Sequence, residues 1–565
     1  MHPWAPKLFL HVRGYSRRVF AMDLVAGITV GLVALPLAMA FAISSGLQPQ
    51  AGIYCAIVTG FLISAFGGSR YQIGGPTGAF VVVVSAIVAE HGIQGLFMCT
   101  MMAGALLVAA GATGLGTAVR FIPRPVVIGF TNGIALLIAS TQVKDFFGIA
   151  VQNVPGDFLG RVHVLAAASG SFSPVSTALA SVSLLAMIRV VRFGARVPPT
   201  LVALLGGTIL AAVAGLQVDT IGTRFGGIPG GLPSIHVPAF RPDLILQLIS
   251  PAITVAMLGA IESLMSAVVA DRMTGDRHNP NVELIAQGVA NVASPLFGGL
   301  PATGAIARTA TSIRSGAQTP VAGIVHACTL AAVLLVAAPL ASYIPMPVLA
   351  AILMLVAWNM GEWREIPDLL KLSRADIAVW MVTLALTVLA DLTVAVEVGM
   401  ILASLLFIRK VVRTTTISEV TNEDVEDGRA HVLQDKQIPE YVSIFRIHGP
   451  FLFGATDKLD LIADRIPSLP PIVVLRLRNM TAIDGTGLAA LEQLADALHA
   501  SGRELLLCGA REQPRTLMAQ AEFHQHVGDA NVCANVQDAI ERARVIYEGH
   551  VKAGAGEGSG RSLVS

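Results

Sequence analysis

Long apolar stretches fill the chain up to about residue 411, and short polar segments rich in Gly and Pro separate them. A helix needs about 20 apolar residues to cross a bilayer. The pattern therefore predicts about fourteen helical membrane elements, seven in each half of this region. The first seven are expected at residues 23–45, 51–66, 76–90, 95–118, 123–140, 173–191 and 198–216. The second seven are expected at residues 246–270, 282–297, 303–314, 319–341, 345–359, 375–391 and 394–409.

Two short motifs occur once in each half. Residues 74–79 read Gly-Gly-Pro-Thr-Gly-Ala, and residues 298–305 read Gly-Gly-Leu-Pro-Ala-Thr-Gly-Ala. Ile-Pro-Arg-Pro-Val at 122–126 likewise matches Ile-Pro-Met-Pro-Val at 344–348. We interpret the region as a duplicated unit of about 220 residues, as in transporters built from internal repeats. An odd number of spans in each unit makes the two copies inverted in the membrane.

The elements at 76–90 and 303–314 are too short to cross a bilayer alone, and both begin at the first motif. Thr77 and Thr303 occupy positions expected for helix N-caps, and Gly78 and Gly304 allow another group to approach the backbone closely. Two helix N-termini that face each other present free N–H groups and about +0.5 charge each, which favours an anion. The alternative is a pair of ordinary helix kinks packed by glycine.

Glu262 and Arg308 are ionisable residues inside predicted spans. A charge at the bilayer centre costs at least about 2.5–3.5 kcal/mol, so both are functional candidates. Together with two helix N-termini, Arg308 gives the site a charge of about +2 when Glu262 is protonated and about +1 when it is ionised. A divalent anion should then bind best together with a proton, which Glu262 would accept. The alternative is a structural Glu–Arg pair that joins two helices, and the two interpretations are compatible.

Composition and charge fit a membrane protein. Hydrophobic residues make up 54% and charged residues 13% of the 565 residues. With the N-terminus inside, the outer loops carry few basic residues, namely Lys144, Arg161, Arg224 and Arg241. This asymmetry follows the positive-inside rule and predicts that both termini are cytoplasmic. The net charge of +1 does not indicate a nucleic-acid partner, and the five cysteines have no metal or disulfide spacing. We expect no metal and no cofactor.

A polar C-terminal domain is predicted at 438–550, after the membrane domain at 23–411. Its strand patterns at 441–447, 472–478 and 504–508 alternate with a helical pattern, which predicts a small α/β domain. The remaining segments are a cytosolic N-terminal segment, a linker and a disordered tail, at 1–22, 412–437 and 551–565 respectively.

Several motifs together resemble the SulP family of anion permeases over nearly the whole chain. They are Asp-Leu-Val-Ala-Gly-Ile at 23–28, Leu-Pro-Leu-Ala-Met-Ala-Phe-Ala at 35–42, Gly-Gly-Ser-Arg-Tyr-Gln-Ile-Gly-Gly-Pro at 67–76 and Asn-Val-Glu-Leu-Ile-Ala-Gln-Gly at 281–288. The resemblance implies a seven-plus-seven inverted-repeat transporter fold, a core domain that moves against a gate domain, and a homodimer. The substrate-binding residues that it implies are Phe41, Thr77, Gly78, Gly304, Ala305, Ala307 and Arg308, with Glu262 for proton coupling and Ser266 and Thr303 in support.

The C-terminal domain resembles a STAS domain. The loop at 481–487 is similar to the STAS loop linked to phosphorylation or nucleotides, which makes Asp484 and Thr486 candidate regulatory residues. The alternative for this loop is a plain N-cap of the following helix.

Two positions bear on the substrate. Sodium-coupled bicarbonate members carry Asp at position 262 and a hydroxyl residue at position 306, where this chain has Glu262 and Ile306. Ile306 cannot offer the oxygen ligands that hard cations need. We therefore expect a proton-coupled sulfate symporter in the lipid bilayer of a bacterial-type inner membrane, working by elevator-like alternating access. Bicarbonate and C4-dicarboxylates are close alternatives. A nucleobase permease, a passive anion channel and a sensor without transport are less favoured, and no motif indicates an enzyme.

Overall fold

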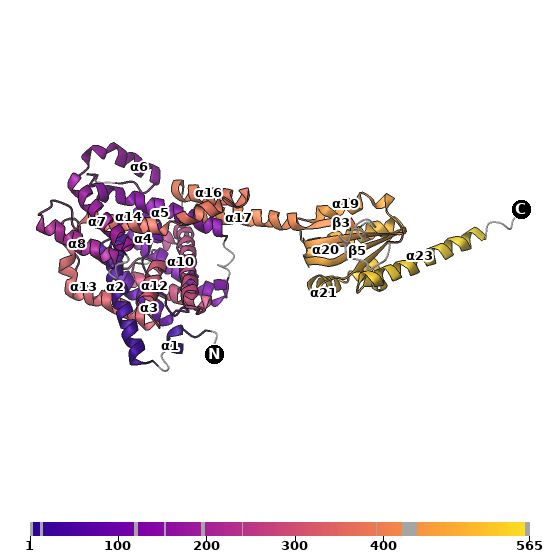
Figure 1. The fold of residues 1–565 in the computed structure, drawn as a ribbon, viewed down its shortest axis with the longest axis horizontal. Coiled ribbons are helices and arrows are strands. Elements are labelled where there is room, and N and C mark those ends of the chain that lie inside the picture. The colour runs from indigo at the N-terminus through magenta and orange to yellow at the C-terminus, as the bar shows by residue number, and fades with distance from the viewer. Residues whose placement is uncertain are drawn as a thin grey trace. The chain divides into compact units, whose positions relative to one another are not determined.

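The structure, a computed structural model, describes residues 4–11, 15–117, 123–151, 154–193, 198–239, 241–390, 392–420 and 438–559. It contains two compact units, Met1–Ala403 and Ser404–Ser565, which are described separately. The first unit is helical and the second is a mixed α/β unit (Figure 1). Residues 421–437 of the predicted linker and 560–565 of the predicted tail lie outside the described residues.

Each of the fourteen predicted membrane elements has a helical counterpart. The helices of the first half are α2 (Arg17–Ser44), α3 (Pro49–Phe66), α4 (Gly78–Ala112), α5 (Arg124–Phe147), α7 (Pro174–Arg192) and α8 (Pro199–Val213). Those of the second half are α10 (Ile245–Thr274), α11 (Pro280–Leu296), α12 (Ile306–Arg314), α13 (Val321–Ala341), α14 (Met346–Met360), α16 (Arg374–Leu389) and α17 (Leu392–Thr414). Among the described residues, eight helical segments are long and apolar enough to cross a membrane. The predicted multi-pass helical fold is thus confirmed.

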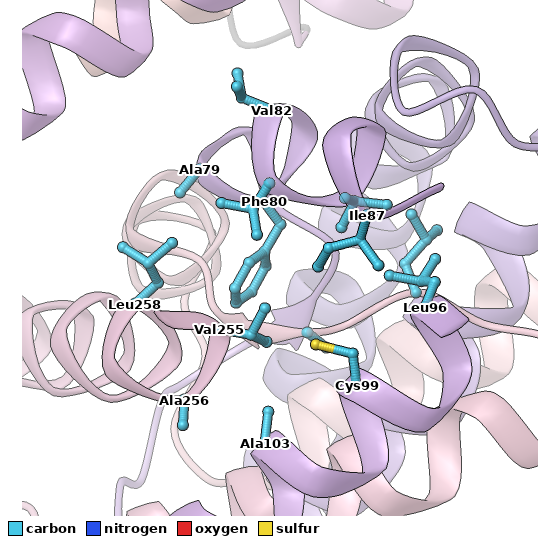
Figure 2. Packing of buried hydrophobic residues seen from close by; sticks show 14 of the residues in the cluster. Ala79, Phe80, Val82, Ile87, Leu96, Cys99, Ala103, Val255, Ala256 and Leu258 are labelled. Atoms are coloured by element: carbon cyan, nitrogen blue, oxygen red, sulfur yellow. The ribbon is translucent and has the colours of Figure 1, made fainter. Parts of the chain in front are cut away.

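One long helix, α4, accounts for two predicted elements. It breaks at Gly92, where φ is 70° and ψ is −176°, a conformation that glycine adopts without steric cost. Phe80 before the break, Leu96 and Cys99 after it, and Val255 of α10 belong to one buried cluster, in which Phe80 points toward Val255 (Figure 2). The break therefore lets both parts of α4 pack on the same apolar core.

Four short α-helices among the described residues of the first unit were not predicted: α1 (Lys7–His11), α6 (Phe158–Ala167), α9 (Ile221–Phe225) and α15 (Ile366–Leu369). Local capping explains two of them. The Asp157 carboxylate accepts a hydrogen bond from the Gly160 amide at 2.6 Å at the start of α6. Thr220 and Thr223 form a reciprocal capping box around α9. These segments are too short to give a clear helical period in the sequence.

The two copies of the glycine motif pair with each other. Strand β1 (Gly74–Gly75) and strand β2 (Thr303–Gly304) form an antiparallel ladder in which Gly74 faces Gly304 and Gly75 faces Thr303. Equivalent segments of the two halves therefore run in opposite directions, as inverted repeats require. Helix α10 packs beside both α4 and α12, the helices that follow these strands (Figure 1).

The second unit is built on a five-stranded sheet. Its strands are β3 (Thr416–Val420), β4 (Val442–Phe451), β5 (Ile472–Ile483), β6 (Glu504–Cys508) and β7 (Val532–Cys533), hydrogen-bonded in that order. The β3–β4 pair is antiparallel and the other pairs are parallel. Alternate residues face opposite sides, so that Phe445 and Val473 join one buried cluster while Ile444 and Val474 join another. Helices α20 (Gly485–Ala500), α21 (Glu512–Gln520) and α23 (Val536–Ser559) complete the predicted α/β domain.

Two boundaries of this unit differ from expectation. Residues 416–420, predicted as linker, form edge strand β3, because five residues with alternating burial pair fully with β4. Helix α23 continues to Ser559, through a segment predicted to be disordered. The glycines of that segment gave the expectation, and glycine lowers helix propensity without excluding helix.

Helices α4 and α11 should be sensitive to small increases in side-chain size. A Cβ atom on Gly104 would lie 2.7 Å from the Gly288 carbonyl oxygen, and one on Gly288 would lie 2.6 Å from the Gly104 carbonyl oxygen. Gly104→Val is expected to lower the free energy of unfolding by about 1–3 kcal/mol through overpacking. Thermal unfolding in detergent would show this as a lower melting temperature. Gly206→Val in α8, where a Cβ meets no atom within 4 Å, is the matched control; equal losses in both variants would contradict the packing argument.

Candidate anion-binding site

The two half-helices start at different points of their motifs. Thr77 is the N-cap of α4, as expected, although its side chain does not cap the helix. The N-cap of α12 is Ala305, two residues after Thr303, so the prediction for Thr303 was wrong. Thr303 instead pairs with Gly75 in the ladder, and its hydroxyl donates to the Gly259 carbonyl at 2.8 Å. The chain stays extended through Ala305 because the Ala305 amide donates to the Ile73 carbonyl at 2.9 Å.

Arg308 connects the second half-helix to the start of the first. Its Nη2 donates to the Pro76 carbonyl at 2.5 Å, and the side chain is 3% exposed. The guanidinium lies against Gly75, where a Cβ atom would overlap with Nη1. Among the described residues, Arg308 forms no ion pair with a carboxylate. A buried cation without a paired carboxylate favours binding of an anion.

Glu262 of α10 contacts Thr77, the residue that follows Pro76. Its carboxylate accepts a hydrogen bond from the Thr77 hydroxyl at 2.8 Å, and its side chain is half-buried. Glu262 and Arg308 thus contact consecutive residues, Thr77 and Pro76. In the described part of the chain they do not form the direct ion pair that a purely structural role predicts. The site therefore contains one cation and one proton-accepting group that are not paired with each other.

Phe41 and Gly78 form an apolar wall beside this segment. Phe41 of α2 is buried, and a Cβ on Gly78 would lie 3.4 Å from the Phe41 ring and 2.9 Å from Ile138 of α5. Gly78 is therefore required for the close approach of α2 and α5 to the start of α4. At the start of α12, Ile306 and Ala307 are the exposed positions.

The remaining predicted residues play supporting parts. Gly304 is buried against the Gln72 side chain, which a Cβ would overlap. The Ser266 hydroxyl donates to the Thr309 hydroxyl at 3.2 Å, and the Thr309 hydroxyl accepts from the Ile73 amide at 3.1 Å. Ser266 of α10 thus stabilises Thr309 of α12, which in turn holds the Ile73 amide next to the ladder. The substrate and coupling roles of all these residues stay predictions.

A second carboxylate, Glu283 of α11, was missed by the sequence analysis. It is fully buried and accepts hydrogen bonds from the Ser69 amide at 2.9 Å and the Gln287 side chain at 3.0 Å. Ser263, next to Glu262, lies 3.5 Å from Glu283 and accepts from Gln72 at 2.6 Å. A polar network therefore runs from Glu283 to the segment that pairs with β2. An acidic residue in the predicted span 282–297 was the available signal.

In the second unit, Asp484 is a helix cap. Its Oδ1 accepts from the Gly487 amide at 2.8 Å at the start of α20, and its Oδ2 accepts from the Phe453 amide at 3.0 Å. Thr486 is exposed in the first turn of α20, so its hydroxyl is accessible. Burial raises the pKa of the Cys508 thiol to about 12, which keeps this thiol protonated and unreactive. The regulatory role of Thr486 stays a prediction.

Comparisons with known proteins agree with this arrangement. Residues 20–383 match the model of the sulfate permease family and residues 434–539 match the model of the STAS domain. YvdB of Bacillus subtilis, a protein named as a sulfate transporter, is 39% identical over 91% of this chain and 96% of its own length. The bicarbonate transporter BicA of a Picosynechococcus species is 31% identical over 92% of this chain and 94% of its own. The chain belongs to the sulfate permease family.

Solved structures support the same fold. The transmembrane domain of a cyanobacterial bicarbonate transporter BicA matches with a TM-score of 0.60 and 35% identity, over 69% of this chain and 98% of that one. A murine Slc26a9 anion transporter in the inward-facing state matches with a TM-score of 0.84, over 96% of this chain and 94% of that one. At 17% identity, the second likeness concerns the fold alone.

Gly75 should be required for the position of Arg308. Its φ of 145° and its contact with the guanidinium mean that Gly75→Ala both strains the backbone and displaces Arg308. Loss of a hydrogen bond to a charged group costs about 1.5–3 kcal/mol, so binding of the anion proposed below, probed with sulfate, should weaken about 10-fold or more. Titration calorimetry in detergent would measure this.

Gly275→Ala is the control that separates backbone strain from displacement of Arg308. Gly275 also has a positive φ, of 75°, but a Cβ there meets no atom within 4 Å. This variant should bind sulfate as the wild type does. Unchanged sulfate affinity in Gly75→Ala would show that Arg308 is not held by this contact.

Asp484→Ala should loosen the start of α20, because two backbone amides lose their acceptor. Loss of such a cap costs about 1–2 kcal/mol, which corresponds to about 5- to 30-fold faster hydrogen exchange at Gly487 and Phe453. Mass-spectrometric hydrogen exchange on the whole protein would detect it. Thr486→Ala, which removes an exposed hydroxyl, is the control and should leave this exchange unchanged.

Proposed function

We propose that the protein is a proton-coupled symporter that carries sulfate across a bacterial-type inner membrane. The observation that carries this proposal is the buried Arg308 guanidinium, which has no carboxylate partner among the described residues. A small anion between the starts of α4 and α12 would neutralise it and would also use the free amides of two helix N-termini. Relatives named as sulfate and bicarbonate transporters support the same class of substrate.

Proton coupling is supported by the charge of the site. The two helix N-termini contribute about +0.5 each and Arg308 contributes +1, so the total with ionised Glu262 is about +1. Protonation of Glu262 raises the total to about +2, which balances sulfate. Since the Thr77 hydroxyl donates to Glu262, the start of α4 would contact both the proton acceptor and the anion.

Alternating access is supported by the way the helices group. The segment with the two half-helices contacts α2, α3 and α10, which would form the moving core. Helix α5 packs tightly on α16 instead: a Cβ on Gly129 would lie 2.7 Å from the Trp380 carbonyl oxygen, and one on Gly133 would overlap with Thr387. Helices α5, α14 and α16 would form the gate. Cytoplasmic termini and a homodimer belong to the same proposal.

Bicarbonate is the second candidate substrate, favoured by 31% identity to BicA over most of both chains. Ile306 argues against sodium coupling of the kind that a hydroxyl ligand would allow, because its exposed side chain has no oxygen. The same vesicle assay can distinguish the two anions.

Glu262→Gln should abolish the response to a proton gradient. In liposomes containing the wild-type protein, an inward proton gradient should raise the initial rate of labelled sulfate uptake and drive accumulation above equilibrium. Glu262→Gln keeps the size and hydrogen-bonding capacity of the side chain but cannot change its charge, so accumulation should be lost. Filtration assays with and without the gradient measure both effects.

Glu90→Gln is the matched control, because Glu90 is an exposed carboxylate at the end of the first part of α4. It should respond to the gradient as the wild type does. Wild-type sulfate uptake that is the same with and without the gradient would refute proton coupling. If sulfate is not taken up at all, labelled bicarbonate and a C4-dicarboxylate are tested in the same vesicles.

A further inference from the structure

A cavity lies away from Arg308, between the end of α2, the middle of α4, and helices α5, α6 and α14. Its volume is about 380 Å³. Its wall on α4 includes Ser85 and Ala89, which follow Gly78 by about 10–16 Å along the helix. Three of the four basic residues assigned to outer loops line it, namely Lys144, Arg161 and Arg224. We call this space the outer cavity.

The basic residues of the outer cavity are only partly neutralised. Arg224 forms an ion pair with Asp145 at 2.6 Å. Arg161 is 3% exposed and donates to two neutral oxygens, the Ser140 hydroxyl at 2.8 Å and the Gly156 carbonyl at 2.6 Å. Within the described residues, the half-buried Lys144 ammonium has no hydrogen-bond or ion-pair partner.

The charge that remains is therefore about +2. It comes from three cations and one carboxylate among the lining residues. Asp157 and Asp219 also act on Arg161 and Lys144, but both are exposed to solvent and neither lines the cavity. The helix ends at the cavity leave this charge unchanged, because their partial charges cancel one another. Helices α2 and α5 end there with about −0.5 charge each, and α6 and α14 begin there with about +0.5 each. An unpaired buried cation is costly unless a counter-charge is near. A small anion of charge −2 fits both the volume and the charge.

We propose that the outer cavity is a second anion site, which holds a soluble divalent oxyanion such as sulfate before it reaches Arg308. This inference rests on the proposed function, because it gives the cavity a place on a transport path. Gln142 of α5 donates to the Ser44 hydroxyl of α2 at 3.0 Å, and both residues line the cavity. That bond joins α2 of the proposed core to α5 of the proposed gate. The shape of the cavity therefore changes when the core moves against the gate.

Lys144→Gln tests the site by transport. The variant removes one unpaired charge and no hydrogen bond, so the protein should fold normally. In cells, where only the outer face meets added sulfate, the KM for external sulfate should rise at least about threefold with little change in maximal rate, as expected when attraction to a charged entrance is weakened. Lys144→Arg should restore the wild-type KM. Arg241→Gln, an exposed outer residue paired with Asp243, is the control and should change neither quantity.

A binding assay keeps this inference separate from the proposed function. Arg308→Ala protein in neutral detergent without added lipid is titrated with sodium sulfate, against sodium gluconate at equal ionic strength, and its melting temperature is followed. Sulfate should raise the melting temperature of this variant, and the rise should disappear in the double variant that carries both Arg308→Ala and Lys144→Gln. If the wild type transports neither sulfate nor bicarbonate yet this pattern holds, the outer cavity stands and the proposed function fails. An unchanged KM in Lys144→Gln, or equal stabilisation by sulfate with and without the Lys144→Gln substitution, would overturn the second site.

Discussion

Backbone hydrogen bonding between β1 and β2 is the interaction on which the membrane unit depends. An extended segment precedes each of the helices α4 and α12 and lies between apolar spans. The amides and carbonyls of these segments need partners within the protein because lipid offers none. The ladder pairs Gly74 and Gly75 with Gly304 and Thr303, and the Ala305 amide and Ile73 carbonyl extend it. One segment from each half is thereby fixed to the other. The starts of α4 and α12 are consequently held in one place, although they lie far apart in the sequence.

Small residues in this ladder decide what can approach it. Arg308 lies against Gly75 and Gln72 lies against Gly304, and a Cβ at either position would overlap with these side chains. A buried guanidinium costs several kcal/mol unless polar partners compensate. The Pro76 carbonyl supplies one partner, and an anion would supply the counter-charge. The glycines are therefore needed less for backbone flexibility than for the space in which a cation can be held at the start of a helix.

The sequence allowed the membrane elements and the repeat to be anticipated, because apolar length and Gly/Pro interruptions are strong local signals. The strand pairing of the two motifs was not predicted. Contacts across the halves were less accessible. Thr303 appeared to be an N-cap, but its pairing with Gly75 keeps the chain extended to Ala305. Glu283 was overlooked although it is an acidic residue in a predicted span, and its contact with the distant Ser69 amide forms only after folding. Strand β3 and helices α6 and α9 are too short for a clear period, and their stability comes from pairing and caps.

The composition of the site bears on how it would choose its substrate. Near the ladder, Arg308 and Glu262 are accompanied by side chains that already hydrogen-bond within the protein. These bonds run from Thr77 to Glu262, from Thr303 to the Gly259 carbonyl, from Ser266 to Thr309 and from Gln72 to Ser263. Such a set offers few directional side-chain donors that could distinguish one oxyanion from another by shape. Total charge then becomes the main criterion. A site of about +1 suits a monoanion such as bicarbonate, and a site of about +2 suits sulfate, so the protonation of Glu262 would change the preferred substrate as well as the rate. On this argument, relatives named for sulfate and for bicarbonate can share one architecture, because one ionisable side chain beside the same segment is enough to change the charge that the site balances.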